Sequence, residues 1–178
     1  MEKIEIRAIT NRAAMYYGAF LGIFLIVRFI VEVLTVDSVT GSFVVLFLFL
    51  LLPIIAYFFT LRFKRQSQIE DITFGTLFRF CFFMFFFASL FLVVVQYVFY
   101  RFIQPDYLSL QFAELIKNID VILADMPQIA PYKEMIVEFG TPAASQRAVQ
   151  SIWIYSVIGV LFGLPIAGIV KSIRKNNY

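Results

Sequence analysis

Residues 72–108 read ITFGTLFRFCFFMFFFASLFLVVVQYVFYRFIQPDYL, and this stretch predicts one long membrane helix. No charged residue occurs from Phe80 to Val95, and the apolar character continues to Tyr100. About 24 residues of this kind are enough to cross about 30 Å of hydrocarbon with some tilt. We therefore expect a membrane helix at residues 77–101.

The two ends of this helix carry recognisable signals. Thr73 precedes the apolar run and can cap the helix by accepting a hydrogen bond from a free backbone amide. Gln104 is followed by Pro105, and the residue before a proline is disfavoured in the α region, so the helix should end there. Arg79 and Arg101 lie near opposite ends, where their side chains can reach opposite membrane interfaces.

The same stretch carries a family resemblance. Ile72–Gly75 leads into the helix, and the helix is followed by a second motif made of Tyr100, Phe102, Ile103, Pro105, Asp106, Tyr107 and Leu108. With these motifs the chain resembles a bacterial inner-membrane family catalogued as domain of unknown function 4199. The resemblance covers nearly the whole chain and implies four membrane helices, with a helical excursion between the third and fourth. It implies no activity and no catalytic residues, and it associates the protein with membrane glycosyltransferases that act on polyprenyl-phosphate sugars.

The composition of the whole chain agrees with a membrane protein. Of its 178 residues, 61% are hydrophobic and only 15% are charged, whereas a soluble domain carries about 25% charged residues. A protein of this size cannot bury that much apolar surface in its own core, so lipid must cover it. The length allows one domain, and we expect residues 1–178 to form a single membrane domain.

The composition also argues against an enzyme. The chain has no histidine, which removes the commonest general base and a common metal ligand. Its one cysteine, Cys81, lies inside the apolar run, so no intramolecular disulfide is available. The net charge of +3 is not a nucleic-acid signal, because the cations are spread over helix ends. We expect no catalytic residues, no metal, no cofactor and no nucleic-acid partner.

Three further apolar runs predict the other membrane helices. They cover residues 13–34, 43–61 and 151–170, and prolines 53 and 165 should bend the second and fourth helices of the chain. The first run could instead be a signal peptide, but about 22 apolar residues without a small-residue cleavage site favour an uncleaved helix. The predicted fold class is all-α, a four-helix transmembrane bundle.

A helical excursion is predicted at residues 105–140. Gly140 should end its second helix, at about residues 132–139. Phe112 and Leu115 should face inward and cap the bundle, with Glu114 and Lys117 facing water. The first helix, at about residues 105–125, is amphipathic because apolar residues recur at steps of three and four, namely Leu108, Phe112, Leu115, Ile119, Ile122 and Met126.

The distribution of lysine and arginine predicts the threading. Three lie before the first helix, four in the loop that ends at Arg79, three in the C-terminal tail and none between the first two helices. By the positive-inside rule both termini and the middle loop are cytoplasmic. In a bacterial inner membrane the excursion is then periplasmic.

Two glycine pairs predict close helix packing. Gly18 and Gly22 lie in the first predicted membrane helix, and Gly159 and Gly163 lie in the fourth. Small residues four apart let two helix backbones approach closely in lipid. Such pairs also arise by chance, because glycine is common in membrane helices. Since both pairs fall in the cytoplasmic half, we expect the first and fourth helices to contact each other directly.

Two polar clusters are candidate sites. The first would form an outward-facing pocket for a ligand with a phosphate or sugar head, although Arg28 and Glu32 at i and i+4 also suit a plain ion pair, and the aromatic residues suit a membrane-interface belt. The second is a group of cytoplasmic cations that can reflect topology alone or contact an anionic lipid phosphate. The outer cluster comprises Arg28, Glu32, Gln96, Tyr100, Arg101 and Trp153, and the cytoplasmic one Arg62, Lys64, Arg65 and Arg79.

The sequence is compatible with three functions. The favoured one is a non-enzymatic subunit or scaffold that binds a membrane partner, such as a polyprenyl-phosphate glycosyltransferase or an envelope-assembly protein. The alternative is a small oligomeric transporter or lipid-handling protein that uses the outer polar pocket. A membrane enzyme ranks lowest. The expected partners are the lipid bilayer and either a second protein or further copies of this chain.

Overall fold

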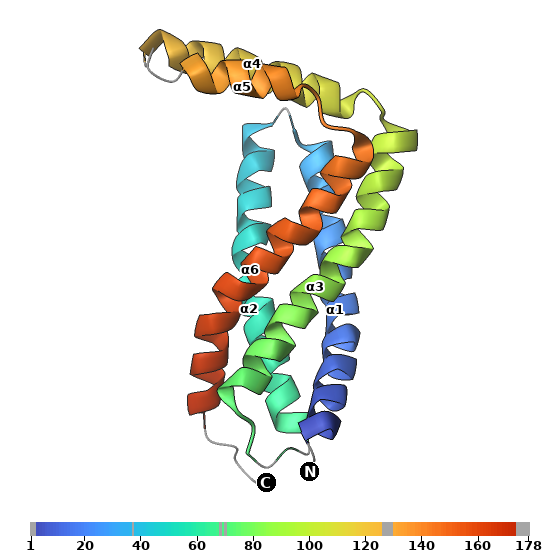
Figure 1. The fold of residues 1–178 in the computed structure, drawn as a ribbon, viewed down its shortest axis with the longest axis vertical. Coiled ribbons are helices and arrows are strands. Elements are labelled where there is room, and N and C mark those ends of the chain that lie inside the picture. Colours follow the sequence, from blue (N-terminus) through green and yellow to red (C-terminus); the bar gives the residue numbers. More distant parts are fainter. Residues whose placement is uncertain (1–2, 37, 68, 70, 126–129, 174–178) are drawn as a thin grey trace. The chain divides into compact units, whose positions relative to one another are not determined.

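The computed structural model describes residues 3–36, 38–67, 69, 71–125 and 130–173, and all regular structure in these ranges is helical (Figure 1). Side chains are described throughout, except at positions 120–125 and 130–132. The helices are α1 (Lys3–Leu34), α2 (Val39–Gln66), α3 (Phe74–Val98), the π-helical segment η1 (Phe99–Ile103), α4 (Tyr107–Asp125), α5 (Ala130–Phe139) and α6 (Ala144–Ser172).

The predicted all-α class with four membrane helices is confirmed. α1, α2, α3 with η1, and α6 are each long and apolar enough to span a membrane. α1 begins ten residues before its predicted start, and α6 begins seven residues before its own. Hydropathy locates the part of a helix that lies in lipid, whereas backbone hydrogen bonding continues into the polar flanks, so the helices are longer than their apolar runs.

The chain forms two compact units. The first comprises Met1–Val93 and Ser151–Tyr178, and the second comprises Val94–Gln150. The boundaries fall inside α3 and α6, so the first unit contains the larger part of the four-helix bundle. The sequence predicted a single domain, and the structure adds this internal division.

α3 is the central helix of the first unit. Phe80 stacks on Phe63 of α2 at 4.3 Å between ring centroids, with the ring planes 2° apart. α1 and α6 also lie against α3, as Figure 1 shows. The residues of α3 that are at most 1% exposed cover a broad face, which comprises Leu77, Phe80, Cys81, Met84, Phe85, Ala88, Ser89 and Leu92.

The glycine pairs pack against α3, so the predicted contact of the first and fourth membrane helices through their glycine faces is wrong, although Arg28 of α1 and Tyr155 of α6 do touch. A Cβ at Gly18 would lie 2.8 Å from Phe87 Cβ, and one at Gly22 would lie 3.1 Å from Phe91 Cβ. On α6, a Cβ at Gly159 would lie 2.9 Å from Phe85 Cβ. Two glycine pairs at the same membrane depth can pack against each other or against a third helix between them. Their spacing in the sequence is the same in both arrangements and could not distinguish them.

The predicted ends of the central and excursion helices are confirmed. Thr73 Oγ1 accepts a hydrogen bond from the amide of Thr76 at 3.2 Å. Gln104 leaves the helical region at φ −139° and ψ 77°. Gly140 follows α5 with φ 65°, a left-handed conformation that glycine adopts without strain. The π-helical turn of η1 before Gln104 was not predicted.

The second unit contains η1, α4 and α5, and α4 and α5 contact each other. Tyr100 of η1 and Tyr107 of α4 are both 6% exposed, and their rings stack at 5.9 Å. The apolar row of α4 is graded, since Leu108 is 7% exposed and Leu115 is 47% exposed. The Ile122 side chain and Met126 lie outside the described residues. That this excursion caps the bundle stays a prediction.

Candidate functional site

Arg28 is the centre of a polar cluster in the first unit. Its Nη1 donates a hydrogen bond to the hydroxyl of Tyr155 on α6 at 3.1 Å and lies 3.3 Å from Glu32 Oε2. Its guanidinium carbon lies 5.8 Å from the centroid of the Phe49 ring on α2. One charged group of α1 therefore contacts both α2 and α6, and the predicted pairing of Arg28 with Glu32 is confirmed.

This cluster keeps unused hydrogen-bonding capacity in an apolar setting. Arg28 Nε is buried and has no hydrogen-bond partner among the described residues. The Arg28 side chain is 18% exposed and that of Glu32 is 42% exposed, so the carboxylate is the more open of the two. A charge in a membrane span is costly unless it is paired, and such charges mark candidate sites.

Tyr155 is the member of this cluster that sequence reasoning missed as a contact of Arg28. It lies on α6, is 6% exposed, and its hydroxyl accepts the hydrogen bond from Arg28. Sequence distance hides such a contact, because 127 positions separate the two residues. Trp153, which was predicted to join the cluster, is 72% exposed, as expected for an aromatic belt.

The other predicted members of the outer pocket belong to the second unit. Gln96 is 9% exposed and Tyr100 is stacked on Tyr107, whereas Arg101 is exposed. A single pocket that joins these residues to Arg28 and Glu32 stays a prediction.

Lys64, one of the four predicted cytoplasmic cations, has a structural role. Its ammonium donates hydrogen bonds to the carbonyl oxygens of Val170, Lys171 and Ile173, at 2.9, 3.1 and 2.6 Å. It is 8% exposed. A cation at the carboxyl end of a helix satisfies free carbonyls and complements the helix dipole. Lys64 therefore caps α6, and its ammonium is not available to a lipid phosphate.

The remaining three cations of that group are arranged differently. Arg79 donates from Nε to Asn11 Oδ1 at 3.1 Å and lies over the Phe83 ring at 5.1 Å, so it joins α3 to α1. Arg62 and Arg65 are exposed. Only these two retain the open position that a contact with an anionic lipid requires.

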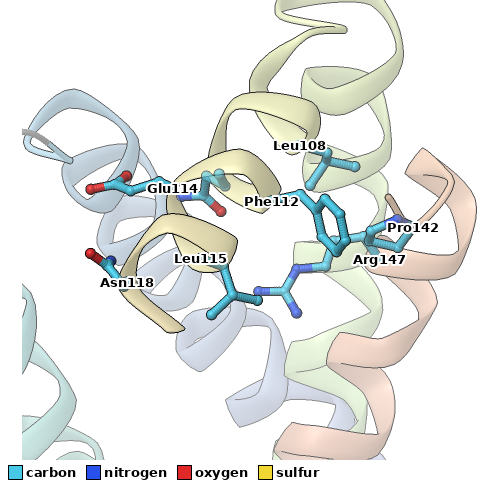
Figure 2. Close-up of a pocket in the computed structure, with 8 residues that line it drawn as sticks. Leu108, Phe112, Glu114, Leu115, Asn118, Pro142 and Arg147 are labelled. Atoms are coloured by element: carbon cyan, nitrogen blue, oxygen red, sulfur yellow. The ribbon is translucent and has the colours of Figure 1, made fainter. Parts of the chain in front are cut away.

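The second unit contains a pocket of about 490 Å³ that sequence reasoning did not predict (Figure 2). Phe112, Leu115 and Glu114 all line it, and the inward orientation of Phe112 and Leu115 toward the bundle stays a prediction. Pro142 and Arg147 form the facing wall. The pocket therefore combines apolar, acidic and basic groups.

No group of three or more potential metal-ligating side chains occurs among the described residues. A family model described as "Protein of unknown function (DUF4199)" matches residues 16–172. No curated protein and no solved structure matches the chain.

Proposed function

Because the chain belongs to the DUF4199 family of proteins of unknown function and is an integral membrane protein, we propose that it is a non-catalytic membrane subunit. In this role α2 binds a transmembrane helix of a partner protein. An enzyme of envelope assembly, such as a polyprenyl-phosphate glycosyltransferase, is the partner class that we propose. The chain's lack of histidine supports a non-catalytic role.

The observation that carries this proposal is the poor burial of α2. In the most apolar window of α2 only 17% of residues are buried, against 28–39% in the other three spans. In the fully described stretch 42–51 no residue is buried. Arg28 of α1 lies over Phe49 of α2, and at this level α1 has two buried residues, Leu25 and Phe29, whereas α2 has none. This half of α2 therefore has free faces where its neighbours are packed.

The exposed residues of α2 have the spacing of a helix-packing seam. Phe43, Phe47, Leu50 and Ile54 follow one another at steps of four, three and four, and they are 68, 61, 58 and 49% exposed. This spacing places them on one face of the helix, where a second helix can pack between the side chains. Lipid alone can also cover such a face, and crosslinking from this face distinguishes a partner helix from lipid.

We propose that the protein lies in the bacterial inner membrane with both ends of the chain in the cytoplasm. The first unit has α1 beginning and α6 ending at the same end of the bundle (Figure 1). Four arginines at this end, Arg7, Arg12, Arg62 and Arg65, are exposed. Exposed cations of this kind are typical of the cytoplasmic side.

A small oligomeric transporter or lipid-handling protein is the second candidate. The observation that favours it is the Arg28 cluster, because the buried Nε lacks a hydrogen-bond partner among the described residues and Glu32 remains open. Transported substrates with a carboxylate or phosphate would suit such a guanidinium.

Site-specific photocrosslinking in living cells tests the proposed subunit role. A photoreactive phenylalanine analogue in place of Phe47 should give one discrete crosslinked protein, because the partner helix would lie on this face. The same analogue in place of Leu161 of α6 is the matched control, since Phe47 and Leu161 are 61% and 62% exposed. The crosslinked species should co-purify with the protein in mild detergent.

Three results can follow. A heterologous protein crosslinked from position 47 and not from position 161 supports the subunit role. A crosslinked dimer of this chain alone supports the oligomeric transporter instead. Crosslinks to lipid only, from both positions, mean that α2 faces the bilayer and that the proposal is wrong.

A further inference from the structure

The pocket of the second unit has two walls. One is α4, and the other is formed by Pro142 and Arg147, at the start of α6. Its volume of about 490 Å³ lies within the range of small-molecule sites. All of its lining residues belong to this unit, so the pocket is independent of the partner surface on α2.

Arg147 is the cation of this pocket, and most of its hydrogen-bonding capacity is unused. Its Nη1 donates to Gln150 Oε1 at 3.0 Å. In the described part of the chain it has no carboxylate within ion-pair distance. A guanidinium carries five N–H donors in a planar fork that fits a phosphate with two parallel hydrogen bonds. Arg147 is thus equipped to bind an oxyanion.

The α4 wall offers two kinds of contact. Leu108, Phe112 and Leu115 form an apolar row, and Figure 2 shows Arg147 extending near Phe112 and Leu115. Glu114 and Asn118 point to the other side of α4 in this view. Glu114 therefore belongs to the pocket lining, but its carboxylate points away from Arg147, and an amphiphile would find the cation and the apolar row side by side.

The position of Arg147 along α6 indicates where this pocket lies. α6 is a candidate membrane span over Ala144–Ser172, and its continuous apolar run begins at about residue 151. Arg147 lies one turn before that run. This is the level at which lipid headgroups, and side chains that bind them, are found.

We propose that this pocket binds the phosphate of an anionic phospholipid, with Arg147 as the phosphate ligand and Phe112 and Leu115 against the glycerol and upper acyl region. The phosphate is assigned to a lipid because the apolar row adjoins the cation and the chain is a membrane protein. A free phosphate would leave Phe112 and Leu115 without a role.

Lipid titration of the purified, delipidated full-length protein, followed by native mass spectrometry, tests the proposal. Phosphatidylglycerol should bind in preference to phosphatidylcholine. Arg147→Gln should weaken phosphatidylglycerol binding by about tenfold or more, as expected for the loss of charge-assisted hydrogen bonds. Lys117→Gln is the matched control, because it removes an exposed cation of the same unit outside the pocket, and its effect should stay within about twofold.

A second variant keeps the test decisive if Arg147→Gln does not fold. Leu115→Trp fills the pocket and retains Arg147, and it should weaken lipid binding to a similar degree. Unchanged binding in a folded Arg147→Gln or Leu115→Trp variant would overturn the proposal. Equal loss in Lys117→Gln would show a general charge effect and would also overturn it. Soluble glycerol phosphate that binds as tightly as the lipid would show a free-phosphate site and rule out the lipid.

Discussion

At the scale of single residues, the bundle depends on positions where a side chain must be absent. Gly18 brings the backbone of α1 against Met84 and Phe87 of α3, and Gly159 does the same for α6 at Phe85. In lipid, where burial of apolar surface gives no advantage to helix contacts, such close packing carries much of the association energy. The two glycine faces therefore attach α1 and α6 to α3.

Gly18→Ala should destabilise the protein by about 1–3 kcal/mol, as expected for overpacking a tight interface. The added Cβ would lie 2.8 Å from Phe87 Cβ and 2.9 Å from the Met84 carbonyl oxygen, so a helix would have to move. Thermal unfolding in one detergent measures the change. Gly168→Ala is the matched control, because nothing lies within 4 Å of its added Cβ and alanine favours the helix. Equal unfolding temperatures for the two variants would refute the packing role.

At the scale of helices, α3 is the element that the others contact. Aromatic stacking joins it to α2, glycine faces join it to α1 and α6, and Thr60 Oγ1 lies 3.1 Å from Cys81 Sγ. Its central part carries no charge from Phe80 to Val95. A helix that packs on three sides needs such a broad apolar face.

The position of α3 against α6 can be tested with its native cysteine. Gly163→Cys should form a disulfide with Cys81, because the two Cβ atoms would lie 3.1 Å apart and a small helix shift reaches the usual spacing of about 3.5–4.5 Å. Mild oxidation followed by peptide mass mapping detects the bond.

The control for this pairing introduces both Gly18→Cys and Gly163→Cys in a Cys81→Ala background. It should remain unlinked, because each glycine faces α3. A crosslink in this control, without one between position 163 and Cys81, would restore the contact of α1 with α6 through their glycine faces.

At the scale of the whole molecule, the chain combines a helical bundle with a second unit inserted between α3 and α6. The insertion begins after Val93 and ends at Gln150, so both of its connections are continuous helices. The proposed threading places this unit in the periplasm and the chain ends in the cytoplasm.

Reporter fusions test this threading. Alkaline phosphatase fused after Gly140 should be active, because that enzyme folds only outside the cytoplasm, and the same reporter fused after Tyr178 should be inactive. A cytoplasmic fluorescent reporter at the two sites should give the opposite pattern and controls for expression. Activity after Tyr178 and none after Gly140 would reverse the orientation.

The sequence by itself determined the number and class of the helices. Long apolar runs, the Thr73 cap, the Gln104–Pro105 stop and Gly140 are local signals, and local hydrogen bonding and backbone sterics are enough to interpret them. The Arg28–Glu32 pair was predictable for the same reason, because i and i+4 share a helix face.

Only the tertiary structure decided which helices touch. It placed α3 against both glycine faces, brought Tyr155 to Arg28, and assigned Lys64 to the carbonyl groups that end α6. These contacts join residues far apart in the chain, and the type of a side chain does not indicate which distant residue it will contact. Any apolar face of a helix can be exposed to lipid at similar free energy, so hydrophobicity does not decide which faces pack together. The arrangement depends on shape complementarity between pairs of helices, which cannot be seen in one helix alone.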